Sequence, residues 1–375
     1  MRKFVIAPDS FKECLSAREV AEALSRGIRK VDPSAEVALL PIADGGEGTL
    51  EAVSREEERV FVTVTGPDGS PVRAAYAIRG GTAIIEMARA AGLTLIPENE
   101  RRVANATTYG VGELIAHAIG QGVRQILLTA GGSATSDGGC GMLAALGARF
   151  LRTDGSSFLP TGGTLSEIDK IDTRDLLLTQ KDCRFTIATD VQNPLLGEKG
   201  ATRMFARQKG ATDAELDQME AGMAHYASIL EQTFGRAVAK IAGAGAAGGL
   251  AVPLLALEIA EIVSGIDAVL SAVGFFEAIR EADAILTGEG KIDRQSLLGK
   301  AISGVVRAAG NVPVYAFVGC VGDPVERLLP LGIKKIYAVR EIADSDEDSM
   351  RNAENHLEKL AEQFAQEQAT SVSGR

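Results

Sequence analysis

Apolar runs alternate with helical repeats at the start of the chain. Lys3–Ala7 and Glu36–Leu40 are typical of buried strands, and residues 17–28 carry apolar side chains at helical spacing. Ser16, followed by Glu19 three residues later, forms a capping box that predicts where this helix begins. The order of strand, helix, strand and helix predicts a parallel sheet with helices outside it.

The same rhythm returns near the C-terminus. Strands are predicted at Ala284–Thr287, Val314–Val318 and Ile336–Val339, each followed by a helix, and the last helix begins at Asp346. The two ends of the chain together supply about five parallel strands. They predict one doubly wound, flavodoxin-like α/β domain.

The middle of the chain has a different pattern. Short strands at Arg59–Thr65, Val72–Ile78 and Thr82–Met87 are separated by Gly-Pro-Asp-Gly and Gly-Gly turns, which predicts an antiparallel meander. We therefore expect a second, mixed α/β domain inserted into the first.

The predicted domains are a doubly wound domain of residues 1–61 and 282–375 and an inserted domain of residues 62–281. A chain of 375 residues is also too long for one ordinary core. Because ligands of open α/β sheets bind beyond the carboxyl ends of the strands, we expect the active site in the cleft between the domains.

The composition narrows the classes of partner. A formal net charge of −11 disfavours nucleic acid and anionic membranes as partners. The 4 cysteines are scattered, and no histidine spacing typical of zinc sites occurs. The apolar run before Pro8 is too short for a signal peptide, so a cytoplasmic protein is expected. The sequence leaves open whether the protein is a monomer or a homodimer.

Residues 131–137 form a glycine-rich loop between a predicted strand and a predicted helix. Backbone N–H groups and hydroxyls of such a loop can hold an anion, and Gly132, Ser133 and Ser136 are the candidates. The alternative is a tight turn in which Ser136 or Asp137 caps the helix.

Acidic residues among Gly, Ser and Thr follow five predicted strands. The loops concerned are Asp9–Lys12, Asp44–Thr49, Asp137–Gly141, Thr189–Pro194 and Thr287–Ser296. Carboxylates that converge at one edge of a sheet must hold a cation or a proton, and Mg²⁺ bound to a nucleotide meets that need. The chemistry implied is phosphoryl transfer. For any single acid, the alternative is a helix cap or an Asx-turn.

Two segments resemble nucleotide-binding motifs but lack essential parts of them. Gly243–Gly248 matches G-x-G-x-x-G, with Asp267 about 20 residues later, as in NAD sites. A poor preceding strand and Pro253 argue against that reading, so we expect Gly245 to pack closely or to contact a nucleotide phosphate. Neither Gly-Lys pair near the C-terminal strands completes a Walker A motif.

Six segments, in matching order, resemble the bacterial type-1 glycerate kinase family. They are Ala7–Lys12, Ala43–Thr49, Gly132–Gly139, Asp190–Leu195, Gly243–Gly249 and Thr287–Gly290. The resemblance runs from residue 4 to about residue 340 and implies ATP-dependent phosphorylation of D-glycerate, a Mg²⁺ requirement and an inserted domain. The sequence departs from the family pattern at Glu13-Cys14, where Gly-Ser is more frequent, and at Ser136, where Asn is usual.

The resulting hypothesis is a glycerate kinase that works by direct in-line transfer. Asp190 is the candidate base, because an ionised carboxylate can accept the hydroxyl proton at pH 7. Lys12, the second candidate catalytic residue, or Lys291 would neutralise the transferring phosphate, and Asp137 and Glu289 would bind Mg²⁺. Candidates for substrate and phosphate binding are Asp9, Ser10, Asp44, Gly45, Gly46, Gly132, Ser133, Ser136, Asn193, Gly245 and Lys291.

Other functions remain open at this point. The product could be 2-phosphoglycerate, which the resemblance favours, or 3-phosphoglycerate, and the acceptor could be a related small hydroxy acid. A ligand sensor on a two-domain scaffold would close on its ligand without ATP. An NAD-dependent dehydrogenase would change nicotinamide absorbance.

Overall fold

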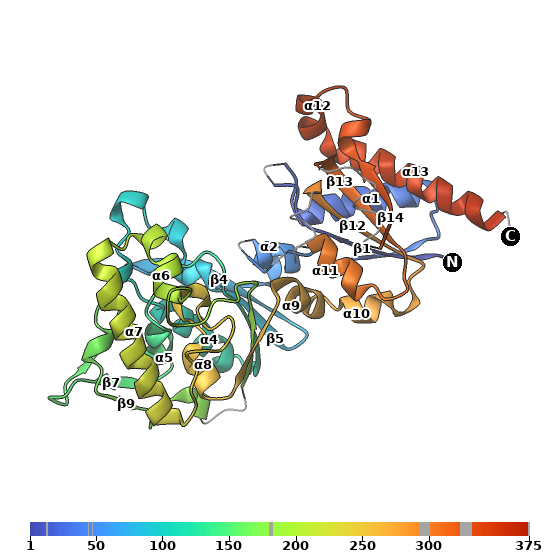
Figure 1. The fold of residues 1–375 in the computed structure, drawn as a ribbon. Helices are drawn as coiled ribbons and strands as arrows, with labels where there is room; N and C mark the ends of the chain where they lie inside the picture. Colours follow the sequence, from blue (N-terminus) through green and yellow to red (C-terminus); the bar gives the residue numbers. More distant parts are fainter. Residues whose placement is uncertain are drawn as a thin grey trace. The chain divides into compact units, whose positions relative to one another are not determined.

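The computed structural model describes residues 1–12, 14–43, 45–46, 48–179, 183–292, 301–322 and 332–373. The chain divides into two compact units (Figure 1). Unit 1 comprises residues 1–44, 51–53 and 266–375, and unit 2 comprises residues 45–50 and 54–265. The sequence pattern places the second boundary near residue 282. The contacts place it at residue 266, because Ile266 packs on Gly304: a Cβ built at Gly304 lies 2.3 Å from Ile266 Cγ1.

Unit 1 contains a five-stranded parallel sheet in the order β14-β13-β12-β1-β2. Its strands are β1 (Lys3–Pro8), β2 (Glu36–Leu39), β12 (Ala284–Ile292), β13 (Val314–Val321) and β14 (Ile333–Ala338). Counted within the unit, the order is 2-1-3-4-5, which is the flavodoxin-like order. The predicted doubly wound parallel sheet is therefore confirmed, and its switch point lies between β1 and β12.

Helices flank this sheet (Figure 1). They are α1 (Ala17–Val31), α9 (Gly265–Ala272), α10 (Phe275–Ala278), α11 (Ala301–Ala308), α12 (Asp346–Arg351) and α13 (Ala353–Ser373). The predicted capping box begins α1: Ser16 N–H donates to Glu19 Oε2 at 2.7 Å. The prediction of a single C-terminal helix is wrong, because α12 ends at Arg351 and is capped by Asn352, whose side-chain amide donates to Asp348 Oδ1 at 2.6 Å.

Unit 2 contains a six-stranded mixed sheet in the order β11-β10-β6-β5-β4-β3. Its strands are β3 (Arg59–Thr65), β4 (Pro71–Arg79), β5 (Thr82–Glu86), β6 (Gln125–Thr129), β10 (Arg184–Ala188) and β11 (Ala260–Val263). The predicted antiparallel meander is confirmed for β3, β4 and β5. β5, β6, β10 and β11 are parallel, so their carboxyl ends lie at one edge.

A small antiparallel sheet and several helices complete unit 2. The sheet has the order β8-β7-β9, with β7 (Arg149–Leu151), β8 (Ser157–Phe158) and β9 (Lys170–Asp172). The helices are α3 (Ala88–Ala91), α4 (Tyr109–Gly120), α5 (Cys140–Ala145), α6 (Ala201–Phe205), α7 (Asp213–Phe234) and α8 (Val252–Ala256), and α2 (Thr49–Val53) crosses the unit boundary. The sequence pattern predicts neither β11 nor the small sheet.

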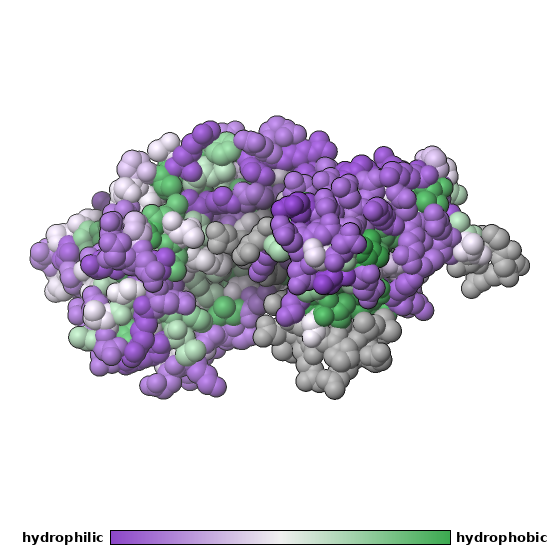
Figure 2. All heavy atoms as spheres, turned by 90° about the horizontal axis from the view of Figure 1, so that it is seen from above, coloured by the Kyte–Doolittle hydropathy of each residue, from purple (hydrophilic) through white to green (hydrophobic). Residues whose placement is uncertain are grey.

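Hydrophilic residues cover most of the face drawn in Figure 2, and the hydrophobic residues on it form separate small patches. Scattered apolar residues of this kind are normal on protein surfaces. Among the described residues, no helix combines the length and apolar character that a membrane span requires.

Substitution Gly27→Ala tests the close packing of α1 on α13. A Cβ at Gly27 would lie 2.2 Å from the Glu358 carbonyl oxygen, so the helices must separate, at an expected cost of about 1–3 kcal/mol. Gly120→Ala is the matched control, because nothing lies within 4 Å of a Cβ there. We expect a lower thermal midpoint for Gly27→Ala only. Equal midpoints for the two variants would contradict this packing.

Candidate active site

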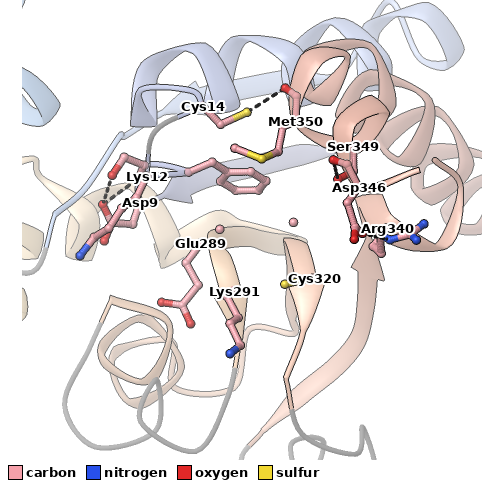
Figure 3. A pocket seen from close by; sticks show the side chains of 14 residues that line it. Asp9, Lys12, Cys14, Glu289, Lys291, Cys320, Arg340, Asp346, Ser349 and Met350 are labelled. Atoms are coloured by element: carbon pink, nitrogen blue, oxygen red, sulfur yellow. Dashed lines mark hydrogen bonds and ion pairs between the residues drawn. The ribbon is translucent and has the colours of Figure 1, made fainter. Parts of the chain in front are cut away.

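A cavity of about 540 Å³ opens at the switch point of the unit 1 sheet (Figure 3). We call it the switch-point cavity. Its lining comes from the segment after β1, from β12 and β13, and from the C-terminal region around α12. It brings together five predicted site residues from distant parts of the chain, namely Asp9, Ser10, Lys12, Glu289 and Lys291.

β12 carries the second group of these residues. The sequence pattern predicts a loop after Thr287, but β12 continues to Ile292, because Lys291 pairs with Cys320 and Ile292 with Val321 of β13. Glu289 and Lys291 therefore lie two residues apart on a strand and project to the same side (Figure 3). Glu289 is only 9% exposed, whereas Lys291 is exposed.

The segment after β1 supplies the first group. Asp9 N–H donates to the Gly288 carbonyl of β12 at 2.8 Å, and Asp9 Oδ1 accepts the Ser10 N–H at 2.6 Å. Lys12 is exposed, and no ion pair is recorded for it among the described residues. The carboxylates of Asp9 and Glu289 and the ammonium groups of Lys12 and Lys291 thus share one cavity.

In unit 2, the glycine-rich loop is held by a residue that the sequence analysis missed. Lys209 Nζ donates to Ser133 Oγ at 2.6 Å and to the Thr135 carbonyl at 2.8 Å, and the side chain is almost fully buried. Burial lowers the pKa of Lys209 to about 7, although the charge of Asp137 acts in the opposite direction. Nothing in the local sequence marks Lys209, because its contacts are with residues more than 70 positions away.

The hydroxyl of Ser136 lies in the same loop. It is buried, and no hydrogen-bond partner is recorded for it within the described ranges. A buried hydroxyl without a protein partner costs free energy unless a ligand or water supplies one. This geometry supports the predicted role of Ser136 in substrate binding.

Asp137 has a structural position. Its carboxylate accepts hydrogen bonds from Thr108 N–H (2.8 Å), Thr108 Oγ1 (2.8 Å), Gly139 N–H (3.1 Å) and Gly141 N–H (3.2 Å). The side chain is fully buried, and burial raises its pKa, an effect that these hydrogen bonds oppose. A metal ion here would have to replace protein donors on both oxygens. The structure thus favours the capping alternative, and we assign no Mg²⁺ to Asp137.

Two glycines explain why the D-G-G segment after Ser136 contains no larger residue. Gly138 and Gly139 have φ of 62° and 75°, in the left-handed region. A Cβ at Gly138 would lie 2.8 Å from the Tyr226 ring, and one at Gly139 would lie 2.5 Å from the Leu250 carbonyl oxygen. These glycines are required by packing.

Asp190 follows β10 and is exposed. Its Oδ1 accepts the N–H of Gly265, which comes shortly after the neighbouring strand β11, at 2.9 Å. Gly45 reaches the same point, since a Cβ built there lies 2.5 Å from Gly265 Cα. The structure therefore brings Asp190 and Gly45 together, and it fixes one carboxylate oxygen of the candidate base.

Asn193 and Gly245 are also neighbours. The Gly245 N–H donates to the Asn193 carbonyl at 2.9 Å, and the Asn193 side-chain amide donates to the Lys199 carbonyl at 2.7 Å. A Cβ at Gly245 would lie 2.3 Å from the Pro194 carbonyl oxygen. Residues 236–242 form no strand before this segment, so the dinucleotide-binding fingerprint is excluded. Of the two expectations for Gly245, the structure shows close packing.

The start of α2 is anchored by Glu86, a second residue that the sequence analysis missed. Glu86 ends β5, is almost fully buried, and accepts the N–H groups of Gly48 (3.2 Å) and Leu50 (3.1 Å). Gly46 accepts the Thr49 hydroxyl at 2.7 Å. The predicted residue Asp44 lies outside the described residues.

The predicted residues therefore form two groups, one within each unit. In unit 1, the residues around the switch-point cavity fit a Mg²⁺–nucleotide complex. Across the described part of the chain, no set of three or more His, Cys, Asp or Glu side chains is placed to hold a metal. Mg²⁺ bound to phosphates needs only one or two protein carboxylates, and Asp9 and Glu289 are two carboxylates that line this cavity.

Comparison with known proteins identifies the family. The sequence profile of the glycerate kinase family matches residues 4–369. This chain belongs to the glycerate kinase family. Glycerate kinase of Bacillus subtilis (strain 168) is 43% identical over 97% of each chain, and glycerate 2-kinase of Escherichia coli (strain K12) is 40% identical over 97% of each chain. The chain is therefore a kinase, as the motif order predicts.

Family membership extends to the fold. The crystal structure of a Salmonella typhimurium LT2 protein assigned as glycerate kinase 2 is 37% identical to this chain, with a TM-score of 0.88 and 100% of both chains covered. The two-domain α/β fold class expected from the sequence is confirmed by this match.

The pH dependence of stability tests the buried state of Lys209. Its pKa is about 7 in the folded protein and about 10.4 in an unfolded chain. Between these values the unfolded state binds the proton that the folded state has lost. The free energy of unfolding should therefore rise with pH, by up to about 1.4 kcal/mol per pH unit.

We expect Lys209→Met to lack this rise in urea unfolding between pH 7 and pH 9.5. Lys240→Met is the control, because Lys240 is exposed and its substitution should keep the wild-type pH dependence. The same slope in wild type and Lys209→Met would show that the ammonium group is not buried.

Proposed function

We propose that the protein transfers the γ-phosphoryl group of ATP to the 2-hydroxyl of D-glycerate and forms 2-phosphoglycerate. The match to the glycerate kinase family over residues 4–369 carries this proposal. The Escherichia coli relative, named glycerate 2-kinase, supports the choice of hydroxyl. A sensor or a dehydrogenase is not favoured, because the chain is a kinase by family.

The proposed roles are divided between the two units. In unit 2, Asp190 accepts the proton as the glycerate oxygen attacks phosphorus and the bond to ADP breaks. The Gly265 N–H orients the Asp190 carboxylate for this task. The loop that contains Ser133 and Ser136 binds the acceptor, and Lys209 keeps it in place.

In unit 1, the switch-point cavity serves the phosphoryl donor. Lys12 and Lys291 bind phosphate oxygens, and Asp9 and Glu289 hold Mg²⁺. The ion, when bound, neutralises charge that develops on the transferring group.

Phosphorus NMR of the product formed from D-glycerate and Mg²⁺–ATP tests the proposed function. We expect the signal of 2-phosphoglycerate. A 3-phosphoglycerate signal would correct the position of transfer. If neither product forms and another small hydroxy acid is phosphorylated instead, that acid and not glycerate is the acceptor.

Substitution Asp190→Asn tests the proposed base. We expect kcat to fall by about 10²-fold or more, with the circular dichroism spectrum unchanged, because the amide cannot accept the proton. Asp217→Asn is the matched control: Asp217 is an exposed acid of unit 2 whose partner is Arg203. Near-normal kcat in Asp190→Asn would remove its assigned role.

A further inference from the structure

The switch-point cavity has a wall that phosphate chemistry does not explain. Phe11 is buried in this wall, and Met350, which is 54% exposed, lines the same cavity. Cys14 and Cys320 add polarizable sulfur atoms, and both are partly buried. Aromatic, thioether and thiol groups of this kind contact flat apolar ligands favourably.

Glycine backbone forms part of the lining that comes from β12 and β13. Gly290 and Gly319 lie there, and a Cβ at Gly319 would lie only 2.4 Å from the Gly290 carbonyl oxygen. The Phe11 segment is held in place, because Phe11 N–H donates to the Leu15 carbonyl at 2.8 Å and Leu15 N–H returns a bond of 2.9 Å. The cavity is therefore a preformed space with an apolar wall.

The charged groups of the cavity are separated. Asp9, Lys12 and Glu289 lie at one side, and Arg340, Asp346 and Ser349 lie at the other (Figure 3). Arg340 Nε and Asp346 Oδ1 form an ion pair, so this second side is close to neutral. A ligand with phosphates and their Mg²⁺ at one end and a weakly polar group at the other end matches this distribution.

We propose that the switch-point cavity binds the nucleoside part of the phosphoryl donor, with its base against Phe11 and Met350. The inference rests on the proposed function and assigns the donor, rather than the acceptor, to unit 1. The phosphates extend toward Lys12 and Lys291, and the sugar and base lie toward Ser349 and Asp346.

Glycerate does not fit the same observations. It is a three-carbon acid with a carboxylate and two hydroxyls, so it has almost no apolar surface to bury against Phe11 and Met350. A volume of about 540 Å³ is in the range that holds drug-sized ligands, as a nucleotide is. In flavodoxin-like sheets, the switch point is also where ligands bind.

Met350→Glu tests the base-binding wall, with binding of Mg²⁺–ADP measured by calorimetry. A carboxylate there replaces an apolar contact with the base by a charged group that must be desolvated, so we expect at least about tenfold weaker binding. The Michaelis constant for ATP should rise similarly, and that for glycerate should not change. Met204→Glu is the matched control, because Met204 is 51% exposed on α6 of unit 2 and should leave both values unchanged.

Alkylation of the cysteines tests the same inference without substitution. Cys14 and Cys320 line the cavity, whereas Cys140 and Cys183 are buried and serve as unreactive internal references. Peptide mapping after N-ethylmaleimide treatment should show that Mg²⁺–ADP, and not D-glycerate, protects Cys14 and Cys320. The reaction is run near pH 8.5, because burial raises the pKa of the Cys14 thiol.

The outcomes separate the two proposals. Protection by glycerate alone, or unchanged ADP binding in Met350→Glu, would overturn the nucleoside assignment even if the enzyme makes phosphoglycerate. Protection by ADP and weaker ADP binding in Met350→Glu, in an enzyme that makes no phosphoglycerate, would support the assignment and reject glycerate as the acceptor.

Discussion

The pairing of β1 with β12 is the interaction on which unit 1 depends. Residues 4–8 pair in parallel with residues 284–288, although the whole of unit 2 lies between them in the chain. At the carboxyl end, Thr287 Oγ1 donates to the Ala7 carbonyl and Asp9 N–H donates to the Gly288 carbonyl, each at 2.8 Å. Because the strand order reverses at this pair, the segment after β1 and the carboxyl end of β12 line the switch-point cavity.

Unit 2 depends on a different and more costly interaction. The ammonium group of Lys209 is buried beside the glycine-rich loop, with two oxygen acceptors. Burial of such a group is unfavourable unless it is well paired, and groups with a strongly shifted pKa are concentrated at functional sites. We infer that the loop is kept in one conformation at a cost in stability. Asp137 has the complementary role, since its four hydrogen bonds join the loop to Thr108 and to the start of α5.

Local sequence patterns predict what local interactions determine. The capping box at Ser16 depends on neighbours within one turn, and the structure has it at the predicted residues. The extension of β12 past Thr287 was not predicted, because Gly288–Ile292 has the composition of a loop and becomes a strand only by pairing with β13. Strand β11 is similar: Ala260–Val263 is short and is stabilised by its pairing with β10.

The candidate site shows the same limit. The positions of the motifs after predicted strands were sufficient to predict that Asp9, Lys12, Glu289 and Lys291 lie close together, because strand ends in a parallel sheet share one edge. They could not reveal Lys209 or Glu86, whose roles depend on hydrogen bonds to residues 36 to 76 positions away. The sequence also could not show whether Asp137 is a metal ligand or a buried helix cap, because an aspartate beside glycines is compatible with both roles.

The insertion of unit 2 has a consequence for how the chain is made. β1 is an inner strand of its sheet, yet its partner β12 leaves the ribosome only after more than 270 further residues. During that interval β1, α1 and β2 have one unpaired sheet edge and an uncovered apolar face, features that favour association with other chains. Unit 2 has all its strands within residues 59–263, so it can fold before the last strands of unit 1 are synthesised. The pairing of β12 with β1 that completes unit 1 is then a late, long-range folding step. Chaperones would matter most for this enzyme in the time before that pairing forms.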